Sequence, residues 1–176
     1  MKKKRIFPII LGLAVMCLVV WLFWSGILRW RQKTKAAEWM EIQLPSHETF
    51  VYMDDHGGFH GDGETVMILS FSPKADAKLR RRMEESAVWK KLPMTTNLRR
   101  CIYGSEELAI TYLSRVQQTE IPEVTNGYWF FLDRQISKED PARYRDEAVL
   151  SRPSINCIAA VYDMDNRILY YWKFDT

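Results

Sequence analysis

Residues 155–174 read INCIAAVYDMDNRILYYWKF, and this stretch decides the fold class. Its two flanks, 155–162 and 168–174, are rich in apolar, aromatic and β-branched residues, which favour strands. The residues between them, DMDNR, are mostly of the types that favour a turn. The pattern therefore predicts a β-hairpin near the C-terminal end of the chain.

Two further regions extend the predicted sheet toward the N-terminus. Residues 49–53 and 65–71 have strand-like compositions, and the loop between them, DDHGGFHGDGE, is dense in Gly and Asp. This order predicts a second hairpin with a long loop. The run YWFFL at 128–132 follows Asn126-Gly127 and predicts a buried strand.

Helical signals lie between these strands. Ser72-Pro73 is a typical helix start, and apolar residues recur every four positions from Ala75 to Ala87. Residues 95–103 predict a second short helix that ends at Gly104. The sequence therefore predicts an α+β domain with an antiparallel sheet of about five strands and one or two helices on one face.

An apolar segment precedes this domain. Residues 6–28 read IFPIILGLAVMCLVVWLFWSGIL and contain no charged side chain, which is enough to span a bilayer as a helix. The run is longer than the apolar part of a typical cleaved signal peptide, so it predicts an uncleaved signal anchor and a single-pass membrane protein. We divide the chain into a cytoplasmic basic N-terminus (1–5), a transmembrane anchor (6–28), a juxtamembrane stalk (29–48) and an extracytoplasmic α+β domain (49–176).

Charge supports this division. Residues 1–35 hold eight of the 25 basic residues and no acidic one, which leaves 17 basic and 22 acidic residues, a net charge of −5, for the rest. Positive flanks favour anionic lipid headgroups, whereas a mildly acidic domain argues against nucleic acid as a partner. The dense cluster at 2–5 favours a cytoplasmic N-terminus and places the C-terminal domain outside the cytoplasm.

One loop has residues suited to metal binding. His56, His60 and Asp62 lie in DDHGGFHGDGE, and imidazole and carboxylate groups both bind divalent metals such as zinc. The alternative is a hairpin loop whose glycines adopt positive φ and whose Asp and His side chains bond the local backbone. The sequence leaves both open, as it does a disulfide between Cys101 and Cys157 against two buried thiols.

Three stretches resemble a known group of proteins: HGGFHGDG at 56–63, NGYWFFLDR at 126–134, and Tyr162-Asp163 with YYWKFDT at 170–176. They are similar to small, uncharacterised, membrane-anchored or lipid-anchored proteins of Gram-positive, Clostridia-like bacteria. The resemblance covers residues 50–176. It implies a location at the bacterial cell surface and carries no activity and no site residue.

Sequence motifs of common catalytic sites are absent from the chain: it has no G-x-S-x-G, P-loop, H-E-x-x-H or C-x-x-C. The leading hypothesis is therefore a non-enzymatic module that contacts an envelope protein or another envelope component, anchored in lipid through its helix. The alternative is metal binding, or a metal-dependent activity, at His56, His60 and Asp62. No other cofactor is predicted.

Overall fold

The computed structural model describes residues 6–57, 62–104 and 121–176. The chain separates into two units, Met1–Ala36 and Ala37–Thr176. Helix α1 runs over Ile6–Trp39, so its last residues belong to the second unit. The predicted stalk, 29–48, is therefore helical as far as Trp39.

The first unit is formed by α1. Its part from Leu11 onward contains an 18-residue window of mean hydropathy 2.3, none of which is buried. By length and composition, this helix is long and apolar enough to cross a membrane. At 1.5 Å per residue, the 23 uncharged residues alone span roughly 35 Å.

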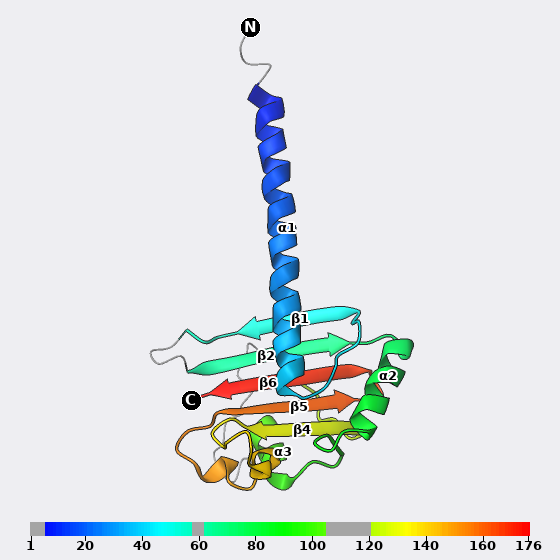
Figure 1. The fold of residues 1–176 in the computed structure, drawn as a ribbon, viewed down its shortest axis with the longest axis vertical. Coiled ribbons are helices and arrows are strands. Elements are labelled where there is room, and N and C mark those ends of the chain that lie inside the picture. The colour runs from blue at the N-terminus through cyan, green and yellow to red at the C-terminus, as the bar shows by residue number, and fades with distance from the viewer. Residues whose placement is uncertain (1–5, 58–61, 105–120) are drawn as a thin grey trace. The chain divides into compact units, whose positions relative to one another are not determined.

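The second unit is an α+β domain with a six-stranded antiparallel sheet, as predicted except for the strand count (Figure 1). The spatial order is β1-β2-β6-β5-β4-β3, and every neighbouring pair is antiparallel. The strands are β1 (Thr49–Asp54), β2 (Gly63–Ser70), β3 (Lys90–Lys91), β4 (Gly127–Asp133), β5 (Cys157–Asp163) and β6 (Ile168–Asp175).

Both predicted helices are present. Helix α2 (Pro73–Glu84) starts as expected, because the Ser72 hydroxyl accepts the Ala75 N–H. It ends earlier than its apolar repeat suggested: Ala87 lies beyond it and is exposed. Helix α3 (Thr96–Tyr103) ends at Gly104, whose φ of 83° suits a glycine C-cap. Two short 3₁₀ turns follow β4, Pro141–Tyr144 and Val149–Ser151.

The two helices lie on opposite faces of the sheet, so the expectation of one covered face is wrong. Tyr128 of β4 donates its hydroxyl hydrogen to Glu84 of α2, whereas Trp129, the next residue, packs in a core cluster with Leu98 and Ile102 of α3. Successive side chains of a strand point to opposite faces. Because both faces of the sheet are covered here, every residue of β4 and β5 is buried, including the aromatic side chains of β4.

The edges of the sheet differ. β3 is two lysines long, a form of edge that discourages pairing with other chains, and it is too short to be predicted from sequence. The other edge strand, β1, has six residues.

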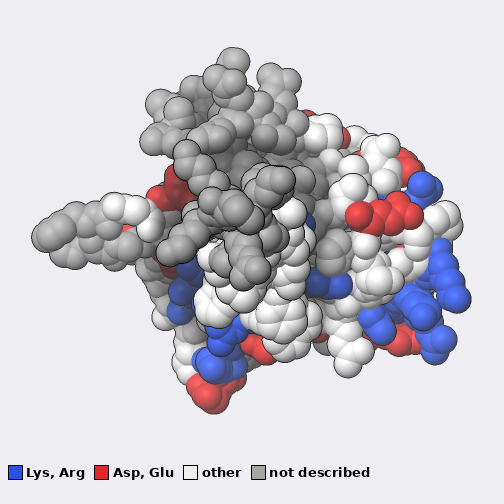
Figure 2. Space-filling view, turned by 90° about the horizontal axis from the view of Figure 1, so that it is seen from above, with Lys and Arg blue, Asp and Glu red and all other residues white. Residues whose placement is uncertain are grey.

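Basic side chains gather on the side of the domain where α2 lies, with acidic ones among them (Figure 2). Arg80 pairs with Asp76 at 3.0 Å, and Arg81 pairs with Glu85 at 2.8 Å. Two of the five basic side chains of α2 therefore have an acidic partner close by in the sequence.

Candidate functional site

The predicted metal loop connects β1 to β2, and hydrogen bonds between Asp55 and Glu64 close its base. The Asp55 N–H donates to the Glu64 carbonyl at 3.0 Å, and the Glu64 N–H donates to Oδ1 of Asp55 at 2.5 Å. Gly63 fits here because it lacks a side chain: a Cβ at this position would lie 2.7 Å from the Cα of His56. Of the predicted loop, residues 58–61, which include His60, lie outside the described residues.

This turn places His56 against the end of the C-terminal strand. Its Nδ1 lies 2.5 Å from Oδ1 of Asp54, and its Nε2 lies 2.9 Å from Oδ2 of Asp175. The register that pairs Gly63 with Asp175 explains the second contact, which joins residues 119 positions apart. The imidazole therefore lies between two carboxylates.

Asp175 is the centre of a wider ion-pair network, the Asp175 network, formed by His56, Arg134, Lys173 and Asp175. The guanidinium of Arg134 and the amine of Lys173 both pair with its carboxylate. Burial alone would raise the pKa of Asp175, but these two cations outweigh burial and lower it. Burial would likewise raise the pKa of Asp54, but its hydrogen bonds, chiefly those with His56, outweigh burial and lower it.

The network bears on the metal hypothesis. Both nitrogens of His56 face carboxylates, so a metal bound to either would have to displace or share that partner. Two cations already neutralise Asp175. Asp62 is exposed just before β2. Within the described ranges, no group of three His, Cys, Asp or Glu residues is arranged to hold a metal ion.

The two domain cysteines are free and buried in the same core cluster. Burial, followed by the nearby Asp146 charge, raises the pKa of Cys101 to about 12. Burial also raises the pKa of Cys157. Both side chains are therefore thiols at neutral pH, the protonated and poorly nucleophilic form.

A second site, which the sequence analysis missed, begins where α1 ends. The Ile42 N–H donates to the Ala37 carbonyl at 3.1 Å, and the Glu41 N–H donates to the Glu38 carbonyl at 3.2 Å. These two bonds form a Schellman motif, in which the residue at the Glu41 position is usually glycine. Glu41 has a φ of 52°, a left-handed conformation that costs a non-glycine residue about 1–2 kcal/mol.

The residues of this cap pack on the face of the sheet that α2 covers. Met40 is fully buried, and its carbonyl accepts the Trp89 indole N–H at 3.0 Å. Trp89 in turn lies 5.4 Å, between ring centroids, from Phe130 of β4. This packing fixes the position of the last turn of α1 within the second unit.

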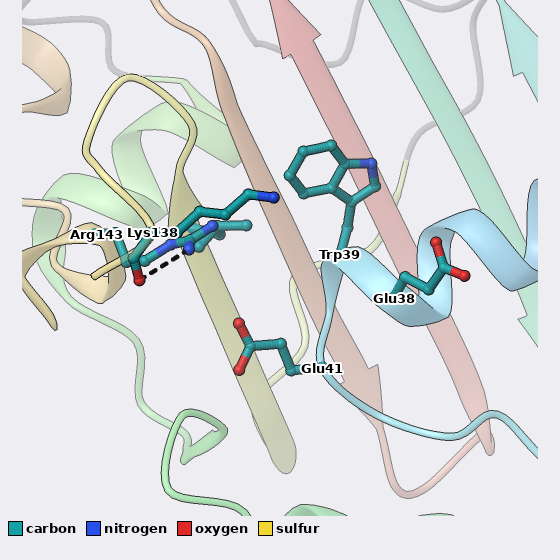
Figure 3. Close-up of a pocket in the computed structure, with 6 residues that line it drawn as sticks. Glu38, Trp39, Glu41, Lys138 and Arg143 are labelled. Carbon is teal, nitrogen blue, oxygen red and sulfur yellow. Dashed lines mark hydrogen bonds between the residues drawn. The ribbon is translucent and has the colours of Figure 1, made fainter. Parts of the chain in front are cut away.

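A pocket of about 290 Å³ lies beside this turn, and we call it the Trp39 pocket (Figure 3). In Figure 3, Lys138 and Arg143 extend toward Trp39, and Glu41 lies below them in the view. The residues that line the Trp39 pocket are Glu38, Trp39, Glu41, Leu132, Lys138 and Arg143.

Neighbouring contacts hold the charged groups of the pocket in place. The Tyr144 hydroxyl donates to Oε1 of Glu41, and burial followed by this bond raises the pKa of Tyr144. Arg143 is only 7% exposed; it donates to the Lys138 carbonyl at 3.3 Å, and its Nε has no hydrogen-bond partner among the described residues. A buried guanidinium with an unused donor is unusual, because such donors are costly to leave unpaired.

Sequence reasoning missed this site for a physical reason. Trp39 and Glu41 fall in the segment expected to be a stalk, and Arg143 falls in a charged stretch without a helix or strand signal. The apolar residues Met40 and Ile42, both buried, are the signal that this segment packs against the domain.

No protein-family model, no curated protein and no solved structure matches this chain.

Proposed function

We propose that the chain is a single-pass membrane protein whose α+β domain acts outside the cytoplasm as a non-enzymatic binding module. The observation that carries this proposal is the order of its parts: an unburied apolar helix runs directly into a domain, and a pocket lined by both charged and apolar side chains lies at that helix's last turn. The resemblance to membrane-anchored proteins of Gram-positive bacteria supports a location at the cell surface.

The short connection supports a role close to the membrane. The second unit begins at Ala37, nine residues after the last residue of the uncharged segment. A helix of nine residues extends by roughly 14 Å, about half the thickness of a hydrocarbon core. The module is therefore suited to contact components at the membrane surface, such as another envelope protein, and the helix itself contacts lipid.

Metal binding at His56, His60 and Asp62 is the alternative. The proximity of Asp54 and Asp175 to the imidazole favours it, since carboxylate and imidazole are both zinc ligands. The two cations on Asp175 oppose it, because a divalent ion there would meet positive charge. We therefore rank it below the binding module.

Cysteine labelling in intact cells tests the orientation. The two domain cysteines are buried, so a membrane-impermeant maleimide should leave them unmodified. Lys78 is exposed on α2 and is a suitable position for a Lys78→Cys reporter; Lys3→Cys is the matched reporter for the other side.

We expect Lys78→Cys to be labelled in intact cells and Lys3→Cys only after permeabilisation. The reverse pattern would place the domain in the cytoplasm and overturn the proposal. Labelling of both reporters only after permeabilisation would overturn it as well.

A further inference from the structure

The Trp39 pocket has the size of a site for a very small ligand. Its volume of about 290 Å³ is at the lower end of the range for ligand pockets, ~300 to 1,000 Å³. A nucleotide or an oligosaccharide is too large for it. A single amino acid or a dipeptide is of a suitable size.

Opposite charges line the pocket without neutralising one another. Lys138 and Arg143 supply two cations, and Glu38 and Glu41 supply two carboxylates. Among the described residues, no ion pair joins either cation to Glu38 or Glu41. A ligand that carries both signs of charge would complement this arrangement.

The buried guanidinium is the strongest single indication of an anionic group in the ligand. Arg143 is 93% buried, yet its Nε has no hydrogen-bond partner in the part of the chain that the structure describes. Its side chain also donates to the Lys138 carbonyl, lies 5.6 Å from the Tyr144 ring centroid and interacts electrostatically with Glu139. A carboxylate accepts bonds from Nε and a terminal nitrogen of arginine together.

Glu41 is the counterpart for a cationic group. The Tyr144 hydroxyl occupies Oε1 and leaves Oε2 for another donor. A glutamate stands here at a left-handed position that favours glycine. Backbone strain of this kind is concentrated at ligand-binding positions, where the side chain is needed.

We propose that the Trp39 pocket binds a small zwitterion, an amino acid or a dipeptide, with its carboxylate against Arg143 and Lys138 and its ammonium against Glu41. The indole of Trp39 and the side chain of Leu132 contact its apolar part. This inference rests on the binding role proposed above and names the ligand class.

Calorimetric titration of the full chain in detergent micelles tests the proposal. The probes are phenylalanine and alanyl-alanine, together with N-acetyl-alanyl-alanine, which lacks the ammonium, and alanyl-alanine amide, which lacks the carboxylate. We expect at least one zwitterion to bind with a Kd below about 5 mM and each blocked dipeptide to bind at least about tenfold more weakly than alanyl-alanine.

Two variants locate the site. Glu41→Gly removes the carboxylate and suits the backbone, so it should weaken zwitterion binding at least about tenfold while the thermal midpoint stays equal or rises. Arg143→Met should weaken it similarly, and Arg145→Met, an exposed neighbour in the same segment, is its matched control.

Three results would overturn the proposal: binding of neither zwitterion by the folded protein, equal binding of alanyl-alanine and both blocked forms, or unchanged binding by Glu41→Gly. Because Glu41→Gly is expected to fold, a folding failure of Arg143→Met does not remove the test. The labelling experiment reports orientation without any ligand, so failure of that proposal and failure of this one are distinguishable.

Discussion

Replacing Asp175 with asparagine should destabilise the domain, because its carboxylate contacts all three other members of the Asp175 network. The substitution keeps the shape of the side chain and removes its charge. It leaves Arg134 and Lys173 without their carboxylate partner, and it weakens the contact with Nε2 of His56. We expect a lower free energy of unfolding at neutral pH.

The structure sets the size of the effect. Hydrogen bonds to charged groups contribute about 1.5–3 kcal/mol each, and three reach this carboxylate. The side chains of His56, Arg134 and Lys173 retain 17%, 22% and 20% exposure, so water replaces part of each interaction. We therefore expect a total loss of about 2–4 kcal/mol, which lowers the midpoint by roughly 4–16 °C for a domain of this size.

The pH dependence gives a sharper test. The pKa of Asp175 is lowered in the folded state, so its contribution is present above the unfolded pKa of about 3.9 and is lost as the pH falls through the folded pKa. Protonated Asp175 resembles asparagine. The difference in midpoint between wild type and Asp175→Asn should therefore be full at neutral pH and should close below about pH 4.

Thermal unfolding followed by circular dichroism from about pH 7 to pH 3 measures this difference. Asp62→Asn is the matched control, because Asp62 is exposed. This substitution should change the free energy of unfolding by less than about 0.5 kcal/mol. A midpoint difference for Asp175→Asn that stays constant over the whole pH range would refute the reasoning. So would a difference at neutral pH no larger than that of the control.

Three further predictions address other parts of the domain. Gly63→Ala should cost about 1–3 kcal/mol, because its Cβ would lie within 3.0 Å of the His56 backbone, while Gly57→Ala, with no atom nearer than 3.8 Å, should be close to neutral in thermal unfolding. Tyr162→Phe should cost about 1–3 kcal/mol in chemical denaturation, since it removes a buried 2.6 Å bond to an aspartate of α2. Elemental analysis of the full chain should find well under one zinc per molecule, and the His56→Ala/His60→Ala variant should have the same zinc content. Stoichiometric zinc that is lost in this variant would establish the metal alternative.

Local signals explain what could be predicted from the sequence. The two hairpins, the strand after Asn126-Gly127 and both helix starts depend on residues within a few positions of each other, and all are present in the structure. The stretch 108–116, whose sequence is compatible with strand or helix, lies outside the described residues. The loop residue His56 was identified, although its partner Asp175 was not.

Contacts distant in sequence explain what could not be predicted. His56 meets Asp175 across 119 positions, and Glu41 meets Tyr144 across 103. Neither pair belongs to a sequence motif, because each contact depends on the order of the strands in the sheet and on which face of the sheet a segment covers. The assignment of α2 and α3 to opposite faces depends on sheet geometry in the same way, because β4 is apolar on both of its faces.

The end of α1 and the residues directly after it have two roles, one in the core of the domain and one in the Trp39 pocket. Met40 fills the core beneath Trp89, and Trp39 and Glu41 form one wall of the Trp39 pocket. A fragment that begins after residue 42 would lack the wall of the pocket and a fully buried core side chain. Loss of a buried methionine costs about 2–5 kcal/mol, a large part of the stability of a typical domain. The end of the apolar helix is therefore part of the folded domain, and the proposed membrane anchor and the proposed binding site share one continuous piece of backbone.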